Sequence, residues 1–141
     1  MAYLDASALA SLFVEDTHSV AMDRWLATSP STLLVSTFAA AELASAVSRR
    51  VRMGLYDTER AWRILASFDA WLAARAVTVH LDAADHVVAA SLVRRFELRL
   101  LTPDALHLAI CQRLGLPLLT FDARQAAAAR ALGIACDPAG A

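Results

Sequence analysis

The stretch LTPDALHLAICQRLGLPLLTFD, residues 101–122, decides the fold class. Thr102 is placed to cap a helix, the proline after it suits the first helical position, and Asp104 favours the positive end of the helix dipole. Gly115 is a typical helix end. The apolar run that follows predicts a buried strand, and this strand ends on Asp122. A helix followed at once by such a strand is typical of an α/β protein.

The rest of the chain repeats this alternation. Helical spacing of apolar residues, capping residues and turn signals divide it into short strands and longer helices. A break is predicted at 15–17 and a turn at 29–31. We expect strands at 2–5, 32–35, 77–80, 117–121 and 134–136, and helices at 6–14, 18–28, 38–53, 58–74, 83–96, 103–114 and 123–132. This order predicts one domain over residues 1–141, with a short, mostly parallel sheet between layers of helices.

Composition limits the classes of function. Of the 141 residues, 58% are hydrophobic and only 19% are charged, an apolar excess that predicts an interface with a partner or a second copy. The net charge of −1 gives no overall signature of nucleic-acid binding. All 13 basic residues are arginine, which excludes any mechanism that requires lysine. No apolar stretch predicts a membrane span or signal peptide, and two distant cysteines fit a reducing cytoplasm.

Four acidic residues stand out by their surroundings. Asp5 and Asp122 each end an apolar strand, Asp104 opens a helix, and Glu42 lies in the apolar frame FAAAELASAV. Each has an ordinary explanation: an aspartate can cap a helix, an acid can favour a helix dipole, and a glutamate can lie on a thin polar stripe. Together they suggest a site, because ligands of open α/β sheets bind beyond the carboxyl ends of the strands.

Clustered carboxylates remain ionised together only when a cation lies among them. Oxygen ligands select a hard divalent ion such as Mg²⁺ or Mn²⁺, which also binds phosphate. The residues therefore indicate metal-dependent phosphoryl chemistry, most simply hydrolysis of a nucleic acid. Two other acid-cluster folds, the haloacid-dehalogenase-like phosphatases and the response-regulator receivers, need a lysine that this chain lacks.

The segments YLDASAL, STFAAAELASAV and LTPDALHLAICQRLGLPLLTFD together resemble the PIN domain, and more narrowly the VapC-type toxins of bacterial toxin–antitoxin pairs. The resemblance covers essentially the whole chain. It implies a PIN-like three-layer α/β/α fold and a Mg²⁺- or Mn²⁺-dependent ribonuclease. One departure is the helix after Asp122, which is rich in alanine and lacks the expected large apolar residue.

The resemblance also implies roles for individual residues. Asp5, Glu42 and Asp104 become the core metal ligands and Asp122 the fourth acid. Further implied features are a homodimer, an RNA substrate and a cognate antitoxin whose C-terminal segment lies in an apolar groove. The supporting hydroxyls would come from Ser7 and Thr120. A non-catalytic PIN-like module that binds RNA or protein, or a PIN nuclease in RNA processing, is the alternative.

Basic residues and a histidine complete the candidates. Clusters of arginine follow the helix of Glu42 and the helix before Asp104, where they either favour the helix ends or hold RNA phosphates. The candidates for RNA binding are Arg49, Arg50, Arg94 and Arg95. His107 follows Asp104 by three positions, so both point to roughly the same helix face. We expect His107 to pack between helices, with a role as ligand or general base as the alternative.

Overall fold

A parallel five-stranded sheet forms the centre of the computed structural model, which describes residues 1–14, 17–29 and 32–137. Its strands are β1 (Ala2–Leu4), β2 (Leu33–Ser36), β3 (Ala76–Val79), β4 (Leu118–Leu119) and β5 (Cys136–Asp137). They lie in the order β3-β2-β1-β4-β5, and all neighbouring pairs are parallel. The central strand is therefore β1, where Leu4 pairs with Val35 on one side and Leu119 on the other.

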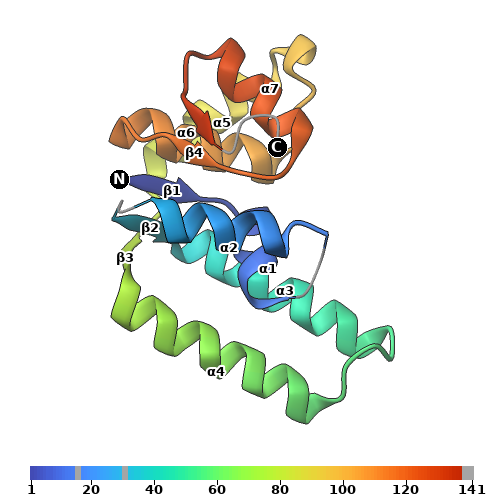
Figure 1. Cartoon of the computed structure of the whole chain (residues 1–141). Helices are drawn as coiled ribbons and strands as arrows, with labels where there is room; N and C mark the ends of the chain where they lie inside the picture. The colour runs from blue at the N-terminus through green and yellow to red at the C-terminus, as the bar shows by residue number, and fades with distance from the viewer. Residues whose placement is uncertain (15–16, 30–31, 138–141) are drawn as a thin grey trace.

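Helices cover both faces of this sheet, as the cartoon shows (Figure 1). Four lie on one face: α1 (Ala6–Phe13), α2 (Ser19–Thr28), α3 (Thr37–Arg52) and α4 (Thr58–Arg75). The other face carries α5 (Ala83–Val93), the 3₁₀ turn η1 (Phe96–Leu98), α6 (Thr102–Leu114) and α7 (Ala123–Ala131). The predicted three-layer α/β/α class is confirmed.

Two hydrophobic clusters fill the space between the layers. Tyr3 belongs to the cluster beneath α5, α6 and α7, whereas Leu4 belongs to the cluster beneath α1, α3 and α4. Successive side chains of a strand point to opposite faces, so β1 contributes to both clusters. Both side chains are fully buried. Because β1 is held from both faces, the residue that follows it, Asp5, has a fixed position.

Capping residues were predicted well, while some element ends differ. Asp5, Ser36, Asp57, Asp82 and Asp122 each accept a backbone N–H at the start of a helix. Strand 117–121 was predicted too long, because only 118–119 pair in the sheet. The helix expected to reach residue 96 ends at 93 and is followed by η1. Residue 102, expected as a cap, is the first residue of α6.

Several other expectations concern the surface and the cysteines. Among the described residues, no helix is both long and apolar enough to cross a membrane. Cys111 is buried, Cys136 is partly buried, and both are free thiols. The predicted break at 15–17 and turn at 29–31 include residues 15–16 and 30–31, which lie outside the described residues.

Candidate functional site

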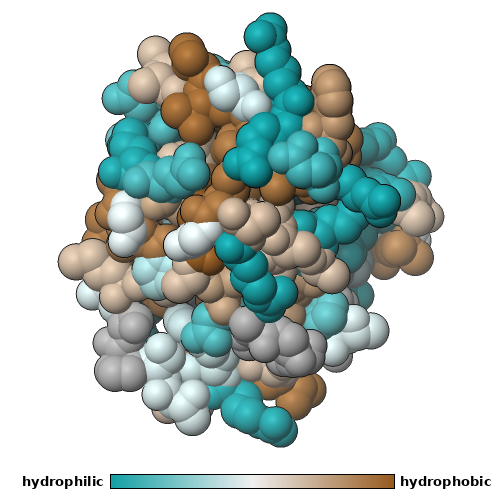
Figure 2. Space-filling model, turned by 90° about the horizontal axis from the view of Figure 1, so that it is seen from above, coloured by the Kyte–Doolittle hydropathy of each residue, from teal (hydrophilic) through white to brown (hydrophobic). Residues whose placement is uncertain are grey.

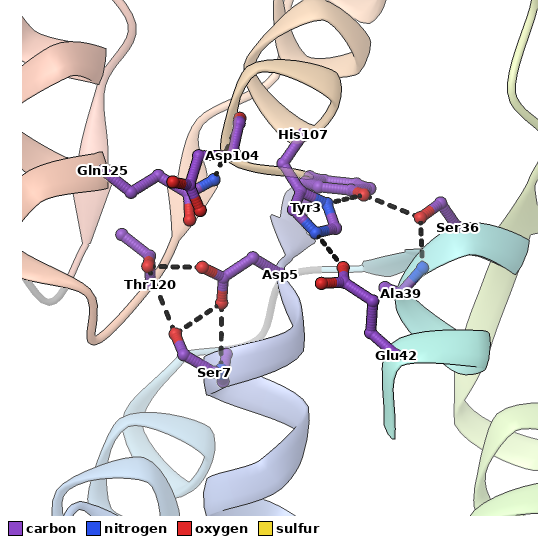
Figure 3. A network of polar contacts seen from close by, with 11 residues as sticks. Tyr3, Asp5, Ser7, Ser36, Ala39, Glu42, Asp104, His107, Thr120 and Gln125 are labelled. Atoms are coloured by element: carbon purple, nitrogen blue, oxygen red, sulfur yellow. Dashed lines mark hydrogen bonds and ion pairs between the residues drawn. The ribbon is translucent and has the colours of Figure 1, made fainter. Parts of the chain in front are cut away.

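Asp5 is the most enclosed acid of the candidate site. It follows β1, caps α1, and is 2% exposed. Its Oδ1 accepts hydrogen bonds from the Ser7 hydroxyl at 2.7 Å and from the Ala8 N–H at 2.9 Å, while Oδ2 accepts from the Thr120 hydroxyl at 2.5 Å (Figure 3). Burial raises the pKa of Asp5 above its usual value, whereas the charge of His107 and these hydrogen bonds lower it.

Ser7 and Thr120 also tie the end of β4 to the start of α1. The Ser7 hydroxyl oxygen accepts from the N–H of Phe121 at 2.9 Å, and that of Thr120 accepts from the N–H of Asp122 at 3.0 Å. Each hydroxyl thus donates to Asp5 and accepts from the backbone that follows β4. Both residues lie where the sequence placed them, beside the acid. Their effect is to hold the Asp5 carboxylate in one orientation.

Glu42 is held by a histidine. It lies in the second turn of α3, and its Oε1 is 2.5 Å from Nε2 of His107 on α6. The other ring nitrogen, Nδ1, is 2.6 Å from the Tyr3 hydroxyl, which in turn is 2.7 Å from the Ser36 hydroxyl. Ser36 accepts from the Ala39 N–H at 2.9 Å as the cap of α3 (Figure 3). A continuous chain of hydrogen bonds therefore runs from the start of α3 to Glu42.

The chemistry of the partners decides which atom donates in each of these hydrogen bonds. An ionised carboxylate only accepts, so Nε2 of His107 carries the hydrogen that points to Glu42. In a neutral ring Nδ1 then accepts from the Tyr3 hydroxyl, whose oxygen accepts from Ser36. Burial is the largest influence on Tyr3 and raises its pKa, so the phenol keeps its proton. When the ring is neutral, these hydrogen bonds thus select the Nε2–H tautomer of His107.

Asp104 and Asp122 form a second, more open pair of acids. The half-buried Asp104, in the first turn of α6, accepts from the Leu101 N–H at 3.3 Å. Burial raises the pKa of Asp104, the Leu101 N–H lowers it, and the negative charge of Asp122 raises it again. Asp122 caps α7 by accepting from the N–H groups of Arg124 and Gln125 at 2.9 and 3.1 Å. Asp122 can therefore both cap α7 and belong to the candidate site.

A divalent ion fits the donors of this site by their chemistry. Asp5, Glu42 and Asp104 lie around one region at the carboxyl ends of β1 and β2 (Figure 3). Their oxygens are the ligands that Mg²⁺ prefers, and burial raises the pKa of both Asp5 and Asp104. Among the described residues no three acidic, histidine or cysteine side chains form a compact metal-binding group. Mg²⁺ accommodates such spacing, because it usually keeps several waters.

The four arginines proposed for RNA binding have other surroundings. Arg50 donates to the carbonyl of Ala46 on its own helix at 3.3 Å, and Arg95 pairs with Glu97 at 2.9 Å. Arg49 and Arg94 are exposed. Within the described part of the chain, the contacts of Arg50 and Arg95 do not reach the acids of the site. Their role in RNA binding therefore stays a prediction.

Two residues of the site, Tyr3 and Ser36, were not identified as functional candidates from the sequence, and one contact of His107 was not foreseen. His107 does pack, against the rings of Tyr3 and Phe38, as expected, but its contact with Glu42 was not foreseen. Tyr3 and Ser36 were interpreted only as part of a strand and a cap. The spacing of Asp104 and His107 was the available signal for His107. Nothing local marks Tyr3, because its partners lie 33 and 104 positions away.

The chain was compared with known proteins. The family model described as PIN domain matches residues 2–131. No sequence among the curated proteins matches. Several solved structures do: VapC20 of Mycobacterium tuberculosis, a toxin that cleaves the sarcin–ricin loop, is 23% identical with a TM-score of 0.74, over 91% of this chain and 95% of that one.

Two further solved structures have similar folds. VapBC2 of Rickettsia felis, bound to a promoter DNA fragment, is 16% identical with a TM-score of 0.70, over 97% of this chain and 98% of that chain. FitAcB of Neisseria gonorrhoeae is 16% identical with a TM-score of 0.67, over 96% of each chain. At such identities these structures establish the fold. With the family match over 2–131, they show that the chain belongs to the PIN domain family.

Proposed function

We propose that this protein is a metal-dependent endoribonuclease that acts as the toxin of a toxin–antitoxin pair. The observation that carries the proposal is the buried Asp5 carboxylate, oriented by two hydroxyls at the carboxyl end of the central strand. Glu42 and Asp104 flank it on a PIN fold. Structures of the same fold include a toxin that cleaves the sarcin–ricin loop and complexes of toxin with antitoxin.

Asp5, Glu42, Asp104 and Asp122 are the residues proposed to hold Mg²⁺ or Mn²⁺. When bound, such an ion supplies Lewis-acid stabilisation of a phosphodiester and a lowered pKa of water. It also removes the repulsion between Asp104 and Asp122 that raises the pKa of Asp104. The donor set supports this choice of ion, because all four side chains offer only oxygen.

The residues around the acids orient them. Ser7 and Thr120 fix both oxygens of Asp5, so this carboxylate needs little rearrangement before it acts. His107 fixes one oxygen of Glu42 and leaves the other free, while the glutamate side chain remains 28% exposed. Such outer partners commonly change metal affinity or activity by about 10–100-fold when removed. We therefore assign Ser7, Thr120 and His107 to positioning.

RNA and a cognate antitoxin are the proposed partners, and the proposed location is the cytoplasm. For the antitoxin segment we propose the groove of about 550 Å³ between α1 and α4, which Leu12, Phe13 and Ile64 line on its apolar side. Arg60 and Arg63 border the same groove and suit an acidic stretch of the partner. A homodimer is proposed because the surface retains large apolar side chains, among them Phe96 at 83% exposure.

Two other functions share this fold. A PIN nuclease in RNA processing would use the same acids on a different RNA. A non-catalytic module that binds RNA or protein would not need them, and the presence of all four acids favours an enzyme. The choice of RNA substrate distinguishes a nuclease in RNA processing from a toxin. RNA cleavage itself distinguishes both enzymes from the non-catalytic module.

The experiment that tests the proposal is cleavage of total RNA by the purified protein with Mg²⁺, with Mn²⁺ and with EDTA. Asp5→Asn and Asp104→Asn are purified in parallel. We expect metal-dependent cuts that both variants lose, and mapping of the new ends then identifies the RNA target. Cutting that persists in both variants would come from a contaminant. Absence of cutting with either metal, after removal of any antitoxin, would favour the binding module.

A further inference from the structure

A pocket of about 320 Å³ lies between η1 and α7. The first turn of α7 adjoins the acids of the site, since Asp122 caps this helix and Gln125 donates to the backbone carbonyl of Asp104 at 3.4 Å. The pocket is lined by Glu97, Leu98, Arg99, Ala123, Arg124, Ala127, Ala128 and Ala131. Its size is at the lower end of the range for small-molecule pockets, about 300–1,000 Å³.

The alanine-rich sequence of α7 explains why this pocket exists. Ala123, Ala127 and Ala131 recur at intervals of four, so they lie along one face of the helix. A methyl group does not reach across to η1, and the space remains open. The alanine side chains of α7 thus form a shallow apolar surface on one side of the pocket.

Two arginines give the pocket its charge. Arg99 has φ 54° and ψ 41°, a left-handed conformation that is unfavourable for a side chain of this kind. It is held there between the buried residues Leu98 and Leu100. Such strain is found mostly where it positions a functional group. In the described part of the chain, Arg99 and Arg124 form no ion pair, so both guanidinium groups are available.

The acid at the pocket does not cancel this charge. Glu97 is paired with Arg95 at 2.9 Å. The remaining positive charges, on Arg99 and Arg124, face an apolar surface of alanine side chains and Leu98. Seen from above, this side of the molecule shows hydrophilic side chains interspersed with hydrophobic ones (Figure 2). Two arginine side chains beside a surface of methyl groups suit an anionic ligand with an apolar part, and a nucleotide has both.

We propose that this pocket holds a nucleotide of the RNA substrate adjoining the phosphodiester that is cut. Arg99 and Arg124 bind its phosphates, and the alanine surface of α7 receives its base. The inference rests on the proposed nuclease function. It assigns RNA binding to Arg99 and Arg124 at the pocket, in place of the arginines at the ends of α3 and α5. Arg50 and Arg95 already have protein partners, whereas these two arginines form no ion pair among the described residues.

Binding of labelled single-stranded RNA tests the proposal. A random-sequence RNA of about 12 nucleotides is used, a length that covers a typical site for single strands, in EDTA so that no cleavage occurs. Removal of one arginine that binds a phosphate should make the plot of log affinity against log salt shallower by about 0.7 and weaken binding about fivefold at ~0.1 M salt. We expect these changes for Arg99→Ala and for Arg124→Ala.

Arg130→Ala is the matched control, since this exposed arginine is also on α7 but does not line the pocket. Equal losses of affinity in Arg130→Ala and Arg124→Ala would mean diffuse attraction and would overturn the proposal. Ala127→Leu fills the pocket without changing charge. It should weaken binding about fivefold or more with an unchanged salt slope, because the leucine side chain occupies the place of the base. Ala70→Leu, an equally exposed site on α4, should have no effect.

The outcomes separate this inference from the proposed function. Unchanged RNA affinity in all pocket variants, with metal-dependent cleavage intact, would refute the pocket and keep the nuclease. Specific losses of affinity in the pocket variants, without cleavage by any metal, would keep the pocket and refute the nuclease. If a labelled poly-glutamate peptide binds the protein but not Arg124→Ala, while RNA affinity is unchanged, the pocket takes an acidic peptide and the proposal is wrong.

Discussion

The two ends of the candidate site are built differently. At one end Asp5 is buried and both of its oxygens accept hydrogen bonds from neighbouring residues. At the other end Asp104 and Asp122 are only partly buried, and the pKa of Asp104 is raised first by burial and further by the charge of Asp122. The first end thus holds one carboxylate whose oxygens both have hydrogen-bond donors. The second end holds two carboxylates of the same charge.

This difference separates what the fold supplies from what a ligand must supply. The hydroxyls of Ser7 and Thr120 hold Asp5 whether or not an ion is bound. The repulsion between Asp104 and Asp122 is relieved only by a cation or a proton. Substitutions at the first end should therefore affect both folding and activity. Substitutions at the second should affect activity and the response to metal.

The largest contrast is expected between Asp5→Asn and Asp122→Asn. Asparagine caps helices about as well as aspartate, so both variants keep their caps. Loss of the Asp5 charge should lower kcat/KM about 10³-fold, the upper end of the range for removing one stabilising group. Loss of Asp122 should cost about tenfold. Steady-state cleavage of a labelled RNA measures both, and equal effects would show that the two ends are equivalent.

Thr120→Val should destabilise the protein by about 1–3 kcal/mol, because it leaves a buried oxygen of Asp5 without a donor. Valine keeps the shape of the side chain and its preference for extended backbone. Urea unfolding measures the change. Thr78→Val, at an exposed position of β3, is the control and should stay within about 0.5 kcal/mol. A Thr120→Val protein as stable as the control would remove the distinction between the two ends.

Tyr3→Phe breaks the hydrogen-bond chain that ends at Glu42. We expect kcat to fall about tenfold with little change in KM, as when an outer partner of a metal ligand is removed. In ¹⁵N NMR spectra, His107 should show the Nε2–H tautomer in the parent protein and a different distribution in the variant. Tyr56→Phe, the second of the two tyrosines, is the control. An unchanged tautomer together with an unchanged kcat would show that the hydrogen-bond chain from Tyr3 does not position Glu42.

The smallest effect concerns pH in the absence of metal. Burial raises the pKa of Asp5 and of Asp104 in the folded protein, so the folded state loses stability as pH rises above the ordinary aspartate range. In EDTA, the Tm should fall on going from about pH 5 to about pH 7. Asp104→Asn should reduce this fall by about 2 °C, which corresponds to less than 1 kcal/mol.

Comparison of the variant with the parent removes the pH dependence that the two proteins share. The pKa of Asp85 is lowered by its hydrogen bonds with Arg113, so its stabilisation is lost only below the ordinary aspartate range, outside this window. A slope of Tm against pH that is identical in parent and variant would contradict the raised pKa of Asp104.

The sequence predicted the elements and acids well because their signals are local. An aspartate at the end of an apolar run predicts both a cap and a place at the sheet edge, as found for Asp5 and Asp122. Burial, which a sequence pattern does not show directly, raises the pKa of Asp5 and of Asp104. The proposed roles of these acids in catalysis and in metal binding stay predictions.

Contacts between segments that are distant in sequence could not be predicted from local patterns. His107 meets Glu42 only because α6 and α3 approach each other across the edge of the sheet, 65 positions apart in sequence. Strand order decides such meetings, and the order β3-β2-β1-β4-β5 has no local signature. The pocket at α7 has the same origin, since the alanine repeat was visible but the position of η1 opposite it was not.

The pairing of β1 with β4 has a consequence for the time at which the candidate site forms. Tyr3 pairs with Leu118, and Thr120 donates to Asp5 across 115 positions. Contacts of such long range form late, because the entropy of closing the loop must be overcome first. During synthesis, the hydroxyl of Thr120 can therefore reach Asp5 only after residue 120 has left the ribosome. Until then, the nascent protein lacks the donor that holds Oδ2 of Asp5.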